Sequence, residues 1–326
     1  MKRIPAIDIA KGIGIVLVVL GHVLGDFGGG ILHDWIYSFH MPLFFIISGI
    51  TLKKTASIQK YFRRLLVPYL IWSLAATGYE LLQTPQLWKS ILFVNTFNTL
   101  STYGIAPFWF LASLFIAVTI CLFIVRTVSN HFYIIGLAVV LLLATSMSAD
   151  YFPQNLSGNL VKAQIRNLWG SAFVFLGYCL PIVSKRKILC IVLVCSGMLS
   201  CLFLLNTGVN MHKLIIGNPI VFTLSATGGS FFILALAQLL GQNACAELIG
   251  RNSLSIMCLH YKTMPVWKFV AWFTGHLCGW SAVVVQSALL IGISLPVGML
   301  MEHFVPFCVG KSKQVNDGIV NTEKRI

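Results

Sequence analysis

The 326-residue chain is 57% hydrophobic and only 10% charged, whereas about 25% of the residues of an ordinary soluble domain are charged. This composition excludes a soluble globular enzyme and predicts a polytopic membrane protein. The formal net charge of +14 arises from short basic clusters between apolar segments and not from a basic domain, so we expect membrane lipid head groups, and no nucleic acid, as the counter-charge.

Apolar segments of about 17–25 residues, the length that crosses a bilayer as a helix, recur along the chain. In chain order they cover residues 6–26, 34–52, 65–83, 107–126, 132–149, 167–183, 188–206, 219–240, 253–273 and 280–304. We therefore predict an all-α membrane protein, a bundle of about ten transmembrane helices. It forms a single domain over 1–310, followed by a short polar cytoplasmic tail, 311–326.

Two segments between the predicted spans are more polar. Residues 91–105, LFVNTFNTLSTYGIA, are rich in Asn, Thr and Ser, and we predict a re-entrant or interfacial piece whose backbone is covered by protein or by a wet cavity. Residues 150–166 are expected to form the largest outer loop. Most of the 23 Lys and Arg residues fall on one side if the N-terminus is inside, which predicts that both termini are cytoplasmic. The first span has no small-residue cleavage site and is expected to stay in the protein.

The first span carries the two most informative residues. KGIGIVLVVLGHVLG, residues 11–25, begins with Lys11 and places His22 near its middle. Eleven residues are three helical turns plus about 20°, so both side chains lie on one helix face, roughly 16 Å apart along the axis. Asp8 can pair with Lys11 at the helix entrance. Small residues on the same segment would allow a helix or a ligand to approach closely: Gly12, Gly14 and Gly21.

An ionisable residue inside a membrane normally faces the bundle interior or a water-filled cavity. A single His in an apolar helix also commonly hydrogen-bonds a neighbouring helix, so His22 needs support from other segments. SFHMPLFFIISG, residues 38–49, supplies His40 at the outer end of the second span. Pro42 suits the first turn of a helix, and Ser48 and Gly49 form a small polar face.

A third polar cluster follows near the end of the chain. GRNSLSIMCLHY, residues 250–261, places Asn252 and Ser253 at a helix start, where they can cap the helix, and His260 within the ninth predicted span. Together with the first two spans, this segment predicts one polar cavity inside the bundle.

The nine cysteines do not have the spacing of metal ligands. Most of them lie in or at the ends of apolar spans, and no CxxC or Cys/His ligand pattern occurs, so packing as small apolar side chains is the expected role. We predict no metal site and no permanently bound cofactor.

Five motifs in this order resemble the bacterial integral-membrane acyltransferases of the acyltransferase type 3 family, in particular its fucose 4-O-acetylase-like branch. They are the basic residue and histidine eleven positions apart within IDIAKGIGIVLVVLGH, then FHMPLFFIISG (39–49), RRLLVPYLIW (63–72), PFWFLASLF (107–115) and GRNSLSIMCLH (250–260). The resemblance covers nearly the whole chain, although Ile50 stands where members often have an aromatic residue. It implies a multi-pass protein of the bacterial cytoplasmic membrane that transfers an acyl group, usually acetyl from acetyl-CoA, to a hydroxyl of a surface glycan or its lipid-linked precursor.

The polyanionic CoA part of a cytoplasmic donor should bind where basic residues converge. We assign this role to Lys11, Arg63, Arg64 and Arg251. The alternative for Arg63 and Arg64 is that they only fix the orientation of the third span. The basic residues 53, 54, 60 and 185–187 are expected to serve topology alone.

His22 is the predicted catalytic residue, with Lys11 and His40 beside it. A neutral imidazole can take the proton of the attacking hydroxyl, or it can carry the acyl group covalently; the sequence leaves both open. His40, His260, Asn252, Ser253 and Trp109 are predicted to contact the acceptor. The alternatives are backbone hydrogen bonding for the two histidines, and a place in the interfacial aromatic belt or a packing role for Trp109.

Two other function classes fit the same architecture. A transporter or flippase for a glycan also has polar residues inside a bundle, but the chain shows neither internal symmetry nor paired interrupted spans. A non-catalytic assembly or signalling subunit would leave the Lys11–His22 spacing unused. The acceptor sugar, the acyl chain and the oligomeric state are not determined by the sequence, which is compatible with an oligomer.

Overall fold

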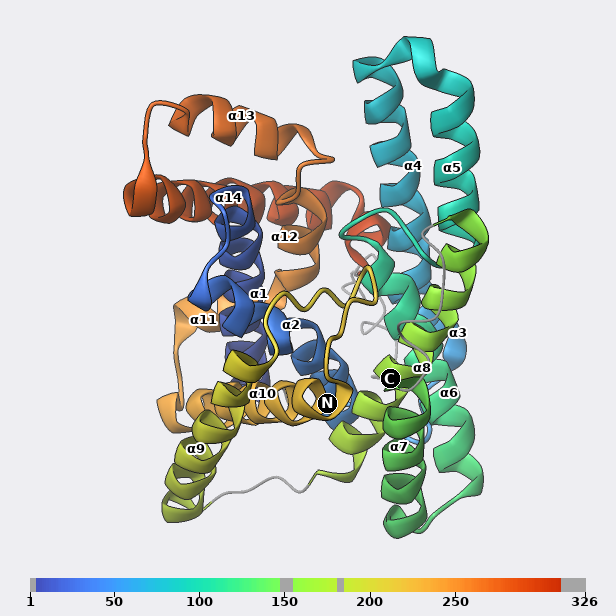
Figure 1. The fold of residues 1–326 in the computed structure, drawn as a ribbon, viewed down its shortest axis with the longest axis vertical. Coiled ribbons are helices and arrows are strands. Elements are labelled where there is room, and N and C mark those ends of the chain that lie inside the picture. Colours follow the sequence, from blue (N-terminus) through green and yellow to red (C-terminus); the bar gives the residue numbers. More distant parts are fainter. Residues whose placement is uncertain (1–3, 147–154, 181–184, 312–326) are drawn as a thin grey trace, which may run out of the picture.

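The computed structural model describes residues 4–146, 155–180 and 185–311, and within these ranges it is all-helical (Figure 1). The elements are α1 (Pro5–Asp26), α2 (Ile31–Ile50), α3 (Ile58–Tyr61), the π-helical turn η1 (Phe62–Leu66), α4 (Val67–Gln83), η2 (Pro85–Leu87), α5 (Trp88–Leu100), α6 (Trp109–Thr127), α7 (His131–Ser146), α8 (Leu156–Cys179), α9 (Arg186–Ser200), η3 (Cys201–Leu205), α10 (Pro219–Leu240), α11 (Ala244–Arg251), α12 (Ser253–Leu259), α13 (Pro265–Thr274), α14 (Gly279–Phe304) and η4 (Pro306–Val309). The predicted tail beyond residue 311 lies outside the described residues.

Six helices or helical runs within the described ranges are long and apolar enough to cross a membrane. They are Pro5–Asp26, Ile58–Gln83, Trp109–Thr127, Arg186–Leu205, Pro219–Leu240 and Gly279–Phe304, and each matches a predicted span. The remaining predicted spans are helical only in part or contain more polar residues. The structure therefore supports a multi-pass helical membrane protein, whereas the count of ten spans stays a prediction.

Three sequence predictions are corrected by the helix boundaries. The span predicted over 253–273 is two helices, α12 and α13, because the chain turns after His260 and Pro265 begins a new helix. Pro42 does not lie in a first turn but inside α2. The described part of the predicted outer loop 150–166 is helical from Leu156, where the side chain of Asn155 caps α8 by accepting from the Gly158 amide.

Helix α1 lies at the centre of the fold and packs against α2, α10, α11, α12 and α14. Its glycines permit this close packing, as the sequence predicted. A Cβ at Gly12 would fall on the backbone carbonyl oxygen of Ala246 in α11, and one at Gly21 would lie 3.0 Å from the Ile36 side chain in α2. The two glycines are nine residues, or about two and a half turns, apart, so α11 and α2 approach α1 from opposite sides.

The other helices surround this centre in groups, which Figure 1 shows. Helix α9 packs on α10, α7 and α6 pack on α8, and α8 packs on α2. The α2–α8 contact is close because a Cβ at Gly177 would meet the Ile46 backbone. Helices α4 and α5 form a hairpin that projects at the top of the view, and α13 lies along α14. Residues 91–100, predicted to be interfacial, belong to α5.

Candidate active site

Three imidazoles meet where α1, α2 and the end of α12 come together. The ring centroid of His22 lies 5.3 Å from that of His260 and 6.5 Å from that of His40. His40 and His260 are buried and His22 is partly buried. The structure thus brings together three histidines that lie up to 238 positions apart in the chain, whereas the polar cavity predicted around them stays a prediction.

The hydrogen bonds of two of these histidines define their tautomers. His40 and His260 each donate Nδ1–H over 2.9 Å to the backbone carbonyl four residues earlier, in Ile36 and Ile256 respectively. A carbonyl oxygen only accepts, so in each neutral imidazole Nε2 carries the lone pair. Nε2 of His260 is buried and has no hydrogen-bond partner among the described residues. A buried acceptor without a donor costs about 1–3 kcal/mol, so a hydroxyl group placed here would be stabilised.

Two tyrosines complete the surroundings of His22. Tyr37 Oη lies 2.9 Å from His22 Nδ1, and the ring of Tyr261 lies 4.9 Å from the His22 ring, nearly perpendicular to it. Tyr37 is in turn stacked on His33 with a centroid separation of 4.0 Å. These contacts fix the orientation of the His22 ring, and the Tyr37 bond leaves Nε2 of His22 as the nitrogen that can face a ligand.

An ion pair between Asp26 and Lys262 closes one end of this cluster. It joins the last residue of α1 to the turn that follows His260. One residue later, Thr263 Oγ1 lies 3.5 Å from the carbonyl oxygen of Ala106. The turn after α12 is therefore held both to α1 and to the segment that precedes α6.

Lys11 lies near the opposite end of α1, where α11 packs against it. Asp8 is 3.7 Å from the Lys11 ammonium and 3.6 Å from the Arg251 guanidinium, and Arg251 also pairs with Glu247 over 2.6 Å. A Cβ at Gly250 would fall on the Asp8 backbone, so only glycine permits this approach. The predicted pairing of Asp8 with Lys11 is present. These two cations and two carboxylates carry no net charge together.

Arg63 and Arg64 lie elsewhere in the structure. Both belong to the π-helical turn η1, which packs against α6 and η4, whereas Lys11 and Arg251 lie where α1 meets α11. The structure brings Lys11 and Arg251 to one carboxylate. A role of Arg63 and Arg64 in binding the same ligand stays a prediction.

Asn252 and Ser253 occupy the start of α12, but the predicted side-chain cap is not formed. Asn252 instead donates its Nδ2 to the Leu248 carbonyl over 2.9 Å, so its side chain closes the end of α11. Its Oδ1 is buried and accepts no hydrogen bond from the part of the chain that the structure describes. Neither residue has a described contact with the three histidines.

Trp109 belongs to a second buried polar cluster, centred on Arg166 of α8, which the sequence analysis missed. Arg166 donates to Ser113 Oγ at 3.2 Å and to the backbone carbonyls of His212, Thr102 and Tyr103 at 3.0, 2.8 and 3.2 Å. Its guanidinium carbon lies 4.3 Å from the centroid of the Trp109 ring. Trp109 is therefore a buried cation–π partner of Arg166 and not an interfacial belt residue.

The rest of this second cluster is neutral and well connected. Ser113 donates to Asn167 Oδ1 over 2.6 Å, and Asn167 donates to Thr102 Oγ1 over 3.2 Å. The His212 ring is parallel to Trp109, with centroids 5.6 Å apart. Burial and the nearby Arg166 charge lower the pKa of His212 to about 3, so its imidazole is neutral. A signal for this cluster was present in the sequence, because Asn159, Lys162 and Arg166 have the spacing of one helix face. The prediction of a loop over 150–166 concealed it.

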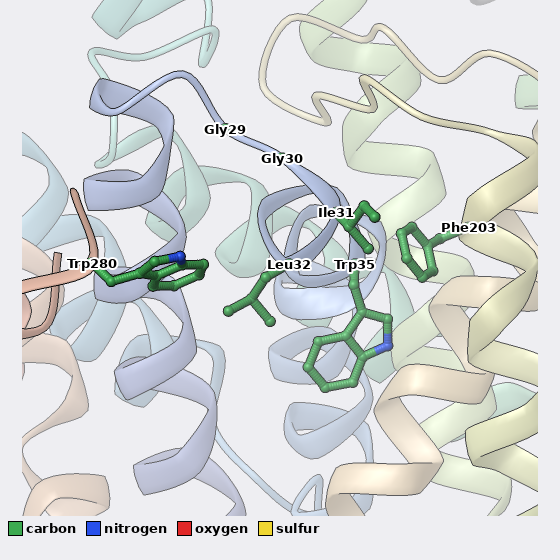
Figure 2. Close-up of a pocket in the computed structure, with 7 residues that line it drawn as sticks. All are labelled: Gly29, Gly30, Ile31, Leu32, Trp35, Phe203 and Trp280. Atoms are coloured by element: carbon green, nitrogen blue, oxygen red, sulfur yellow. The ribbon is translucent and has the colours of Figure 1, made fainter.

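A separate apolar pocket of about 530 Å³ lies beside the α1–α2 connection (Figure 2). Its lining consists of Gly29, Gly30, Ile31, Leu32, Trp35, Phe203 and Trp280. These residues offer no titratable side chain, so the pocket adds no reactive group to the histidine cluster. In the described ranges, no group of three or more His, Cys, Asp or Glu side chains is arranged to hold a metal ion, and this includes the three histidines.

Comparison with known proteins identifies the chain at the level of the family. An acyltransferase domain model, that of acyltransferase type 3, matches residues 4–303. The nodulation protein NolL of Mesorhizobium japonicum is 33% identical over 132 residues, which cover 36% of this chain and 34% of that protein. The match thus spans about a third of the length of this relative. No solved structure matches the chain.

Proposed function

The chain belongs to the acyltransferase type 3 family, and on that premise we propose that it is a membrane O-acyltransferase that moves an acetyl group from cytoplasmic acetyl-CoA to a sugar hydroxyl. The acceptor is a cell-surface polysaccharide or its lipid-linked precursor. The proposed location is the bacterial cytoplasmic membrane. Acyl-CoA is a substrate in this proposal and not a resident cofactor.

The observation that carries the proposal is the meeting of His22, His40 and His260 inside the bundle. In the tautomer with the proton on Nδ1, His22 donates to Tyr37 Oη, and Nε2 carries the lone pair. This nitrogen can accept the proton of a sugar hydroxyl. The lone pair of His260 Nε2, to which no described residue donates, can orient the same or a neighbouring hydroxyl.

Two routes satisfy the chemistry of transfer. In the first, His22 Nε2 removes the hydroxyl proton while the hydroxyl oxygen attacks the thioester carbonyl carbon; the C–S bond then breaks and the CoA sulfur takes up the proton. In the second, Nε2 itself attacks the thioester carbonyl carbon and the C–S bond breaks, with CoA leaving as the thiolate. The sugar hydroxyl then attacks the carbonyl carbon of the acyl-imidazolium, the C–N bond breaks, and the hydroxyl proton goes to the CoA thiolate. Both routes need an uncharged His22.

The donor is proposed to bind toward the Lys11 end of α1. Helical geometry places Lys11 roughly 16 Å from His22 along the axis, a distance that an extended CoA arm can span. Lys11 and Arg251 already contact Asp8, so CoA phosphates would compete with this carboxylate. Arg63 and Arg64 on η1 are the other basic residues proposed for this role.

The test is the transfer of labelled acetyl into the surface glycan of cells that express the protein. Wild type and His22→Ala are compared at matched membrane levels. Label that depends on His22 supports the acyltransferase. Substrate flux across the membrane without any acylation would instead support the transporter or flippase hypothesis.

A further inference from the structure

Two cations on α8 are buried without a carboxylate partner among the described residues. Lys162 and Arg166 are four residues apart, so they share a face of the helix, and their residues are 2% and 0% exposed. Arg166 contacts neutral acceptors, namely one hydroxyl and three carbonyls. The Lys162 ammonium has no hydrogen-bond partner within residues 4–146, 155–180 and 185–311.

The carboxylates in the described ranges are all engaged elsewhere. Asp8 and Glu247 contact Arg251, Asp26 contacts Lys262, Asp34 contacts His33, Glu80 accepts from Asn95, and Glu302 contacts Lys311. The Lys11 and Arg251 charges are thus balanced by two acids, whereas those of Lys162 and Arg166 are not. A buried and uncompensated charge is costly, so such a pair indicates a binding site for an anion.

The occupied donors of Arg166 narrow the type of anion. Its Nη2 already donates to the Thr102 and Tyr103 carbonyls and its Nε donates to Ser113. Neither edge of the guanidinium is therefore open to the bidentate contact that carboxylates prefer. The free donors are the three ammonium hydrogens of Lys162 and one Nη1 hydrogen of Arg166, a set that suits the several oxygens of a phosphate, for which lysine is a common point-charge ligand.

We propose that Lys162 and Arg166 bind a phosphate group of one of the enzyme's two substrates. The aromatic rings of Trp109 and Tyr103 lie beside the guanidinium, where they can contact a group attached to the phosphate.

The segment before α6 links this site to the three histidines. The backbone carbonyls of Thr102 and Tyr103 accept hydrogen bonds from Arg166. Three residues after Tyr103, the Ala106 carbonyl contacts the Thr263 side chain. Thr263 in turn lies three residues after His260. A phosphorylated substrate held at Lys162 could therefore extend toward His22. The phosphate belongs either to a lipid-linked sugar or to CoA. The assignment of the site to one of these substrates rests on the proposed function, whereas the binding of phosphate itself does not.

The test measures phosphate binding to the purified full-length protein in an uncharged maltoside detergent. Inorganic phosphate is titrated at constant ionic strength against chloride, and the thermal midpoint of unfolding is followed by tryptophan fluorescence. We expect a saturable rise in wild type and a half-saturating concentration at least tenfold higher for Lys162→Met. Lys213→Met, an exposed lysine next to His212, is the matched control and should stay within twofold of wild type.

Two results would overturn the site: no saturable rise beyond that given by chloride, or the same response in Lys162→Met as in wild type. Competition against phosphate then identifies the source, with glucose 1-phosphate standing for a sugar phosphate and CoA for the donor. If one of these compounds competes with phosphate in wild type but not in Lys162→Met, the result supports the assignment of the site to that substrate. If neither compound competes, the result contradicts the assignment to a substrate. His22→Ala should bind phosphate as wild type does, so loss of acyl transfer and loss of phosphate binding are separate outcomes.

Discussion

Substitution of Tyr37 by phenylalanine tests whether His22 acts through a fixed tautomer. The Tyr37 Oη to His22 Nδ1 separation of 2.9 Å is that of a well-formed hydrogen bond. A bond to a neutral imidazole is worth about 0.5–1.5 kcal/mol and one to a charged imidazole about 1.5–3 kcal/mol. If His22 takes up a proton during transfer, the transition state loses about 1–1.5 kcal/mol more than the ground state, which is the difference between these two values. The rate should therefore drop roughly tenfold at about 1.4 kcal/mol per tenfold.

The assay is the initial rate of acetyl transfer from labelled acetyl-CoA in membranes that contain equal amounts of each variant. Because Tyr37 is proposed to act on His22 and not on the substrates, kcat should fall with little change in KM. Tyr261→Phe is the matched control, since its ring also contacts His22 but it has no described hydrogen bond to it. The rate of Tyr261→Phe should stay within about threefold of wild type, because this substitution removes no hydrogen bond to His22. Equal rates for Tyr37→Phe and wild type, or a loss confined to KM, would refute the positioning role.

Three further substitutions test the packing and the donor end of α1. Gly12→Ala should destabilise the protein by about 1–3 kcal/mol, because the added Cβ would meet the backbone of α11. Gly292→Ala on α14 is the control, since Gly292 has open space around it, and it should not lower the thermal midpoint. Equal midpoints for the two variants would contradict the close contact between α1 and α11. Arg251→Gln should raise the KM for acetyl-CoA by about tenfold, the value of one hydrogen bond to a charged group, and an unchanged KM would remove Arg251 from the donor site. Trp72→Phe leaves the buried Cys308 carbonyl in η4 without its 2.9 Å hydrogen-bond donor. The free energy of unfolding should fall by about 1–3 kcal/mol, which a lower thermal midpoint would show; an unchanged midpoint would contradict the role of this hydrogen bond.

The sequence predicts the centre of this fold well because its signals there are local. Helical spacing places Lys11 and His22 on one face, and the small residues on α1 predict the close packing that the structure confirms at Gly12 and Gly21. Five of the six apolar spans differ from the predicted limits by at most two residues at either end. The break at His260 was missed, although Pro265 was the available signal, since proline cannot continue a helix.

The charge relations between distant segments could not be predicted, because they depend on how those segments pack together. Asp8 was expected to pair with Lys11, but its contact with Arg251 arises from the packing of α11 on α1. The cluster around Arg166 joins four segments, the turn at 102–103, the start of α6, α8 and the segment before α10. Its polar residues lower the local hydropathy, so a hydropathy-based interpretation assigns them to a loop. Burial of the two cations on α8 appears only once these segments are packed together.

The most direct test of the central claim, that the imidazole of His22 takes part in acyl transfer, is chemical rescue of His22→Ala. The purified variant is assayed with labelled acetyl-CoA and acceptor membranes, with and without added imidazole. General base catalysis contributes about 10²- to 10⁴-fold, so transfer should fall by at least 100-fold and recover in part, saturably, with imidazole. Transfer by His22→Ala at a rate close to wild type would contradict the claim, as would a loss that imidazole does not relieve in a variant with an unchanged thermal midpoint.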